Sequence, residues 1–263
     1  MATSKTKYLI INGDDFGSSE SANRGIIDAF RNGILRSASL MVPCPWFPQA
    51  VELAKQHGLS CGLHMTLTCE YHKYHFGPLT RAPELTRDKK GYTFIANPNE
   101  LPADGQEVVY RELEAQMERF LDFGLKPAFV DAHMGVVPRW DKAFLPVAER
   151  LYERFRVPFL RLEQNAGPKD LPLALVAGVG SSPEKDLPLK QRFHKQLEAL
   201  PEGVTYMNCH PAILTDEMLG MELHAGFAAP RQTDLDVLRD PEVRQWTRDL
   251  GIELISAAEL PKA

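Results

Sequence analysis

Short apolar runs alternate with longer amphipathic segments along this chain. The runs are rich in β-branched residues and predict buried strands at residues 8–11, 37–42, 60–68, 128–133, 158–162, 204–208 and 252–255. Helical spacing of apolar positions between these runs predicts intervening helices, and strands that alternate with helices indicate a parallel sheet covered by helices. The pattern therefore predicts an α/β fold, a (β/α) barrel that is irregular or seven-stranded, formed as a single domain by residues 1–263.

The helices are predicted with unequal clarity. The clearest has apolar residues at helical spacing through residues 107–123, followed by Gly124. The others are expected at residues 18–30, in a short segment ending near His57, and at 143–152, 184–200 and 233–250. The stretch 163–182 is rich in Pro and Gly, and its pattern predicts no element.

Residues 69–105 interrupt the alternation with a segment rich in Pro, Gly and aromatic residues. A loop of this length inside a compact domain is either functional or partly structured, and residues 91–95 could form a small strand. The aromatic residues could stack against a sugar, or they could seal the loop onto the barrel. They are Tyr71, Tyr74, Phe76 and Tyr92.

Composition narrows the class of protein. With 44% hydrophobic and 25% charged residues, the 263-residue chain has ordinary globular composition. The net charge of -5 and the absence of a Lys/Arg cluster argue against nucleic-acid binding. No secretory signal and no membrane-spanning run is visible, so we expect a cytoplasmic protein without membrane contact. The four cysteines lack C-x-x-C spacing and are expected to be reduced and structural: Cys44, Cys61, Cys69 and Cys209.

Two adjacent carboxylates follow the first predicted strand, in the stretch Asn12-Gly13-Asp14-Asp15-Phe16-Gly17. Like charges this close raise each other's pKa unless a cation or a shared proton intervenes, and a metal ion is the simplest cation. The alternative is a solvated turn in which Asp15 or Ser18 caps the next helix.

Three histidines fall at or near other predicted strand ends: His64, His133 and His210. Strand ends of a parallel barrel converge, so these side chains should meet the Asp pair. One carboxylate with two imidazoles is an open ligand set that suits zinc, and a carboxylate-rich surrounding would also accept magnesium or manganese. Each histidine alone is more often a core or rim residue, but their joint placement indicates one site.

These motifs, in this order and over nearly the whole chain, resemble the YdjC-like carbohydrate deacetylases, the group that includes chitooligosaccharide deacetylases. The resemblance is carried by the Asn12–Gly17 opening, Gly62-Leu63-His64, Asp131-Ala132-His133 and His210-Pro211. It implies a barrel-like fold and metal-dependent removal of an acetyl group from an N-acetylated sugar or oligosaccharide.

The resemblance also implies residue roles. Asp15, His64 and His133 would bind one divalent ion, magnesium or zinc, Asp14 would be the general base and His210 the general acid. A homodimer is left open. Many relatives carry further histidines just after the position of His133, where this chain has Met134 and Gly135, and this difference bears on the substrate more than on the metal ligands.

The chemistry fits these residue types, because amide hydrolysis needs an activated water, a Lewis acid and a proton for the departing amine. Asp131 could orient a histidine, and Arg161 could steady Asp14 or bind substrate. Three alternatives stay open: another metallohydrolase such as a phosphoesterase, which should show more cationic groups; a non-catalytic sugar-binding barrel, which should lack part of the set; and a Cys209/His210 nucleophile. The last is disfavoured because strand neighbours point to opposite faces.

Overall fold

The computed structural model describes residues 6–160, 171–221, 223 and 226–260, with only the backbone considered at 136–143. In these residues, parallel strands form one sheet in the order β4-β3-β2-β1-β6-β5, and β7 pairs with β1. The strands are β1 (Lys7–Phe16), β2 (Ser37–Leu40), β3 (Ser60–Met65), β4 (Val130–Ala132), β5 (Leu175–Gly178), β6 (Gly203–Cys209) and β7 (Ile252–Leu254). The parallel α/β barrel-like architecture expected from the sequence is confirmed.

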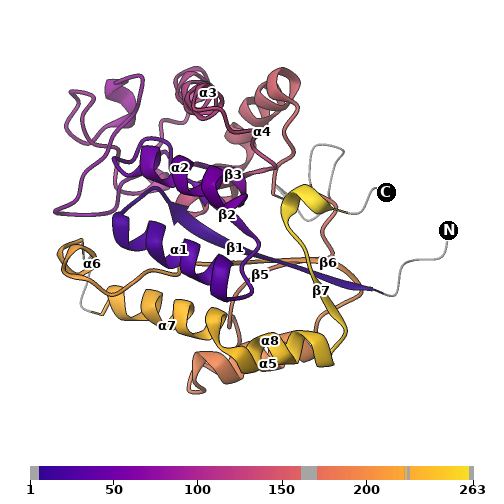
Figure 1. Cartoon of the computed structure of the whole chain (residues 1–263). Coiled ribbons are helices and arrows are strands. Elements are labelled where there is room, and N and C mark those ends of the chain that lie inside the picture. Colours follow the sequence, from indigo (N-terminus) through magenta and orange to yellow (C-terminus); the bar gives the residue numbers. More distant parts are fainter. Residues whose placement is uncertain (1–5, 161–170, 222, 224–225, 261–263) are drawn as a thin grey trace.

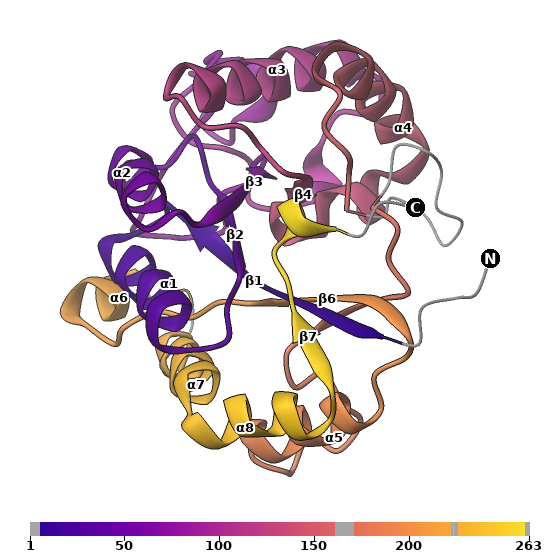
Figure 2. The same ribbon diagram turned by 45° about the vertical axis from the view of Figure 1, so that its right-hand side comes forward.

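The helices surround the curved sheet (Figures 1 and 2). Figure 2 shows α3 and α4 beyond one end of the sheet, α1 and α2 along its flank, and α5 and α8 beyond the other end. The bounds are α1 (Glu20–Asn32), α2 (Phe47–His57), α3 (Gln106–Asp122), α4 (Val136–Phe155), α5 (Leu189–Glu198), α6 (Asp216–Gly220), α7 (Ala228–Arg239) and α8 (Pro241–Asp249). Short 3₁₀ helices lie at Pro83–Leu85, Pro98–Glu100, His133–Gly135 and Ala257–Glu259.

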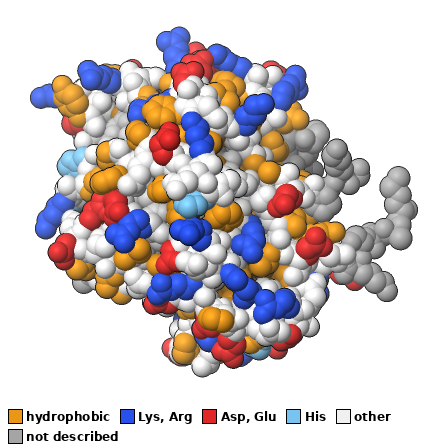
Figure 3. All heavy atoms as spheres, viewed as in Figure 1, with side chains coloured by type: hydrophobic (Ala, Val, Ile, Leu, Met, Phe, Trp, Pro, Cys, Tyr) orange, Lys and Arg blue, Asp and Glu red, His pale blue; other side chains and the backbone are white. Residues whose placement is uncertain are grey.

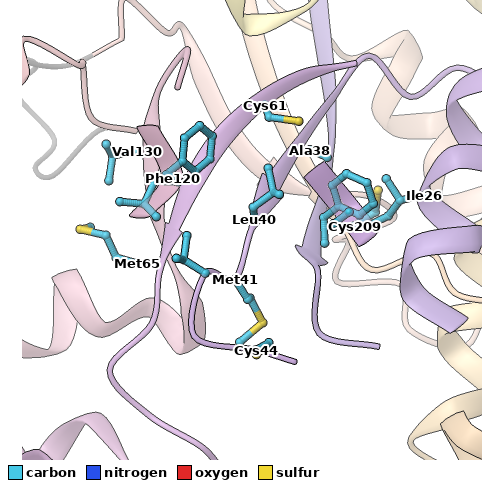
Figure 4. Close-up of a cluster of buried hydrophobic side chains, with 14 of the residues drawn as sticks. Ile26, Ala38, Leu40, Met41, Cys44, Cys61, Met65, Phe120, Val130 and Cys209 are labelled. Atoms are coloured by element: carbon cyan, nitrogen blue, oxygen red, sulfur yellow. The ribbon is translucent and has the colours of Figure 1, made fainter. Parts of the chain in front are cut away.

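Alternating side chains of each strand point to two different environments, as the period of a β-strand requires. The outward-facing set is apolar and packs beneath the helices, where Figure 4 shows Ala38, Leu40, Cys61, Met65 and Val130 in one buried cluster. This cluster is the main hydrophobic core. Its burial fixes the register of the central strands β1, β2, β3 and β6, because a shift by one residue would turn their inner set outward.

The inward-facing side chains are apolar toward the amino-terminal ends of the strands, called the lower layer here, and polar at the carboxyl ends. Ile10, Phe129 and Tyr206 pack together in the lower layer. Two residues further along the same strands stand Asn12, Asp131 and Asn208. The change from apolar to polar follows directly from two-residue spacing, and it gives the sheet a polar cavity at the end where its strands converge.

Two predicted elements are corrected by the structure. The predicted strand 158–162 is wrong: within the described residues it makes only an isolated bridge between Phe159 and Val130, and the fifth strand lies instead at Leu175–Gly178. The predicted helix 233–250 is two helices, because Pro241 begins α8 and the Asp240 side chain accepts a hydrogen bond from the Glu242 amide.

The surface and the cysteines add two observations. Basic, acidic and apolar side chains are interspersed over the face shown in Figure 3. Across the described residues, no helix combines the length and apolarity needed to cross a bilayer. All four cysteines are free and buried, which agrees with the expectation of reduced thiols.

The close packing at Gly62 generates a stability prediction. A Cβ at this position would lie 2.6–2.7 Å from ring atoms of the fully buried Phe129. We expect Gly62→Ala to lower the free energy of unfolding by about 1–3 kcal/mol, because the buried ring must move to make room. Urea unfolding measures this. Gly220→Ala is the control, since its Cβ would meet nothing within 4 Å; equal stability of both variants would contradict the packing argument.

Candidate metal and catalytic site

Asp14 and Asp15 both face the polar cavity although they are neighbours in β1. In a regular strand their side chains would point to opposite faces. Asp15 has a left-handed backbone conformation with φ 65°, and the pairing of β1 with β2 shifts register between Gly13 and Phe16. This irregularity turns the second carboxylate into the cavity, as bulges beside functional sites often do.

Asp15 lies between two imidazoles and a guanidinium. Its Oδ1 is 3.2 Å from His133 Nδ1 and 3.6 Å from His64 Nε2, and its Oδ2 is 3.2 Å from Arg231 Nη2. Burial raises the pKa of this carboxyl, but His133 and Arg231 outweigh burial and hold the pKa well below its ordinary value. Oδ1 is nevertheless buried without a hydrogen bond of good geometry.

His64 is oriented by a carboxylate behind it. Its Nδ1 lies 2.7 Å from Asp131 Oδ1, and the two residues are register partners in β3 and β4. Asp131 Oδ2 accepts a hydrogen bond of 3.1 Å from the Tyr206 hydroxyl. With its proton on Nδ1, His64 presents the Nε2 lone pair to the cavity, which is how second-sphere carboxylates orient ligand histidines. The expected role of Asp131 in orienting a histidine is supported by this contact.

His133 also has one ring nitrogen against a carboxylate and the other facing the cavity, but the positions of Nδ1 and Nε2 are the reverse of those in His64. Its Nε2 lies 3.0 Å from Glu70 Oε2, while Nδ1 faces Asp15. Burial lowers the pKa of His133, but the negative charges of Glu70 and Asp15 more than compensate and raise it to about 10. The two imidazole rings meet edge to face, with centroids 5.5 Å apart.

Three potential ligand atoms, one each from Asp15, His64 and His133, lie within 4.8 Å of one another. The two spacings that involve Asp15 Oδ1 are 3.2 Å to His133 Nδ1 and 3.6 Å to His64 Nε2. Both are close to the separation of about 3.3 Å expected between ligand atoms that lie about 2.0–2.1 Å from tetrahedral zinc. The sequence therefore predicted a carboxylate and two histidines that do converge, and the unsatisfied Asp15 oxygen supports an ion among them.

A second group of potential ligands, Asp14, His64 and Asp131, is already satisfied by protein donors. Asp14 Oδ1 accepts 2.7 Å from Asn12 Nδ2, and its Oδ2 accepts 3.0 Å from Asn208 Nδ2. Burial raises the pKa of Asp14, and the charge of Asp131 raises it further while His64 opposes both. These contacts fix the Asp14 carboxylate in place beside Asp15 and His64, and its pKa is raised.

His210 follows the end of β6 and reaches the same cavity. Its Nε2 lies 3.8 Å from Asp14 Oδ2, and its side chain is 41% exposed, far more than the ligand residues. The backbone amide of His210 donates to Asp234 Oδ2 at 2.8 Å. His210 therefore stands at the mouth of the site, accessible to a substrate. Its neighbour Cys209 is buried and faces away, donating to the Asn12 carbonyl, so a Cys–His nucleophile is excluded.

The cavity has a volume of about 540 Å³, within the range of small-molecule sites. Its floor is the polar cluster, and its apolar rim includes Met134, Leu160, Val176, Leu223 and Phe227. The loop aromatics take no part in its lining. Tyr71 and Phe76 are buried, and Tyr71 packs edge-on against Phe227, so these rings seal the loop onto the barrel.

Sequence reasoning missed four polar residues that line the site: Glu70, Tyr206, Asn208 and Arg231. Asn208 could have been found, because it lies two residues before His210 on a predicted strand and must share its face. Glu70 lies in the irregular segment 69–105 and Arg231 in α7. At neither position does the spacing of residues in the sequence predict that the side chain points toward the site. Arg161, considered for Asp14 or for substrate, lies outside the described residues.

Fold and site together define a parallel α/β half-barrel that carries a buried Asp–His–His cluster at its strand ends. The profile described as YdjC-like protein matches residues 8–249, and the chain belongs to this family. A carbohydrate deacetylase of Geobacillus stearothermophilus is 34% identical, covering 97% of this chain and 99% of its own length. A chitooligosaccharide deacetylase of Citrobacter koseri is 32% identical, covering 94% and 97%.

A solved structure gives the same fold. The protein comes from Enterococcus faecalis V583 and was provisionally assigned to cellobiose-phosphate cleavage. It superposes with a TM-score of 0.80 and 24% identity, covering 96% of this chain and 98% of its own. At this identity the similarity establishes the architecture alone.

The raised pKa of His133 predicts that metal binding releases a proton from this imidazole. In metal-free protein the imidazole should carry both protons at pH 7, because its pKa is about 10. Zn²⁺ must displace one of them, so binding should release a proton at pH 7 and weaken as the pH falls. NMR titration of the metal-free protein, with His133→Gln to assign the signal, measures this. A His133 signal titrating near the ordinary value of about 6.5 would contradict it.

Proposed function

We propose that this protein is a metal-dependent deacetylase that removes the acetyl group from an N-acetylated sugar or oligosaccharide. The observation that supports this most is the convergence of Asp15, His64 and His133. Each imidazole has its outer nitrogen against a carboxylate, which leaves the inner one free to bind an ion. The names of the relatives supply the substrate class, and the whole chain is proposed to act as one unit.

Two imidazoles and one carboxylate suit zinc best, although magnesium stays a candidate. A divalent ion held there would polarise the acetyl carbonyl and lower the pKa of a water molecule. All other steps fall to side chains of the cavity. The Arg231 guanidinium forms an ion pair with Oδ2 of Asp15, and this contact keeps the carboxylate ionised and in place.

Asp14 is proposed as the general base. Asn12 and Asn208 hold both of its oxygens, and burial raises its pKa toward the range where a carboxylate accepts protons readily. Asp14 would take a proton as water oxygen bonds to the acetyl carbon. His210, at the accessible mouth, would give a proton to the sugar nitrogen as the carbon–nitrogen bond breaks. The products are acetate and the free amine.

A phosphoesterase on the same scaffold is less well supported. Phosphoryl transfer favours cationic groups around the site. Among the described residues that line the cavity, Arg231 is the one guanidinium, and it is engaged by Asp15.

Acetate release tests the proposal. A panel of N-acetylated mono- and oligosaccharides is assayed before and after chelation, and after adding back Zn²⁺ or Mg²⁺. We expect Asp14→Asn to retain the ion and lose about 10²- to 10⁴-fold in kcat, because only the base is removed. Asp15→Ala should lose the ion. The exposed Asp104→Asn is the control and should behave as wild type.

Two outcomes would count against this division of roles. Equal ion loss in the Asp14 and Asp15 variants would remove the distinction between base and ligand. No acetate from any sugar, at full metal content, would favour the phosphoesterase or a sugar-binding barrel.

His210 can be tested through the leaving group. Replacing His210 by Gln should slow amide hydrolysis strongly, because an amine leaves only after protonation. An activated ester such as 4-nitrophenyl acetate leaves without that proton, so its hydrolysis should fall much less in the same variant. Asp14→Asn, which affects the attacking water, should slow both substrates. Equal losses for amide and ester in the His210 variant would argue against a general acid.

A further inference from the structure

Glu70 contacts His133, a proposed metal ligand, and lies in the irregular segment 69–105, outside the strands and helices of the barrel. We infer that Glu70 is a positioning residue: it fixes the ring of His133 so that Nδ1 faces the ion, and it thereby sets the affinity for that ion. The inference rests on the proposed function, because it presupposes an ion between Asp15, His64 and His133. It concerns a residue outside the strands and outside the ligand set.

The first argument is the equivalence of the two histidines. Asp131 lies 2.7 Å from the outer nitrogen of His64, and Glu70 lies 3.0 Å from the outer nitrogen of His133. With the Nε2 proton donated to Glu70, Nδ1 is the nitrogen that can lose its proton and bind an ion beside Asp15. Without an acceptor at Glu70, the His133 ring could place its proton on either nitrogen.

The second argument is that Glu70 is held firmly enough to orient a ring. It lies shortly after β3, and its side chain is 10% exposed. The preceding residue, Cys69, donates its amide to the Ile95 carbonyl at 2.8 Å and receives the Arg87 guanidinium on its own carbonyl. Thus the irregular segment 69–105 closes back on itself at the point where it supplies Glu70.

The third argument is the charge of the cavity. Its described lining contains four carboxylates, those of Asp14, Asp15, Glu70 and Asp131, and one guanidinium. This excess of negative charge favours a divalent cation over an empty site. Glu70 lies on this lining with its Oε2 3.0 Å from His133 Nε2, so its carboxylate adds to the negative charge directly beside a proposed ligand.

Zn²⁺ affinity of the metal-free full-length protein tests the inference directly. Competition with a chromophoric chelator is measured for wild type, Glu70→Leu, Glu70→Gln and the exposed Glu100→Gln from the same segment. We expect Glu70→Leu to bind Zn²⁺ about 10- to 100-fold more weakly, as loss of an outer-sphere partner does. Glu70→Gln keeps an oxygen that accepts from Nε2 and should lose less. Glu100→Gln should match wild type.

Co²⁺ substitution gives a second readout, because its visible absorption reports ligand arrangement. The bands should shift in Glu70→Leu and return toward wild type in Glu70→Gln, a recovery that loss of loop packing alone would not produce. If Glu70→Leu does not fold, Glu70→Ala, which also removes the acceptor and adds no bulk, replaces it in both measurements. Zn²⁺ affinity and Co²⁺ bands equal to wild type in every folded Glu70 variant would overturn the inference alone. A wild type that binds no ion would overturn the proposed function as well.

Discussion

Burial of negative charge is the constraint on which this cavity depends. A carboxylate removed from water is stable only when hydrogen bonds or positive charge replace its solvation. Asp15 meets Arg231 and two imidazoles, whereas Asp14 receives two amides and has the partly exposed His210 imidazole 3.8 Å away. The same burial therefore has opposite results, a lowered pKa for Asp15 and a raised one for Asp14. Adjacent residues of one chemical type thereby differ in how readily they take up a proton, which is the basis on which different roles are proposed for them.

The strands make this difference possible because they deliver side chains in layers. Inward positions two residues apart pass from Ile10 through Asn12 to Asp14, so a dry lower layer supports a polar one. Tyr206 joins the layers: its ring packs in the lower layer, and its hydroxyl reaches Asp131. The orientation of His64 is therefore tied to the packing of the barrel interior, and rigidity of the site comes from the fold itself.

Much of this arrangement was readable from the sequence. Apolar runs marked the strands, and the convergence of strand ends in a parallel barrel was enough to group Asp14 and Asp15 with three histidines. The choice of Asp15, His64 and His133 as ligands came from the resemblance to the YdjC-like family, and the inward turn of Asp15 depends on a backbone irregularity that the pattern does not predict. The prediction failed where local pattern is weak. Leu175–Gly178 is an edge strand that leaves Leu175 and Val176 exposed, and it therefore lacks the buried alternation that marks a strand.

The remaining site residues depend on tertiary packing. Glu70 reaches His133 because an irregular segment folds back on itself, and Arg231 reaches Asp15 from a helix that follows a loop. The strand period of 2 residues and the helix period of 3.6 residues do not predict that either side chain points into the site. Side chains of this kind become visible only when the contacts of the whole chain are known.

The left-handed backbone at Asp15 shows what the cavity demands of the first strand. Glycine would adopt this conformation without the steric cost, about 1–2 kcal/mol, that a Cβ incurs there. A glycine would, however, leave the largely buried Arg231 guanidinium without its counter-charge, and removing one partner of a buried ion pair costs about 3–5 kcal/mol. The chain therefore tolerates an unfavourable backbone conformation at this one residue because the side chain it turns inward neutralises a cation brought there by a distant helix.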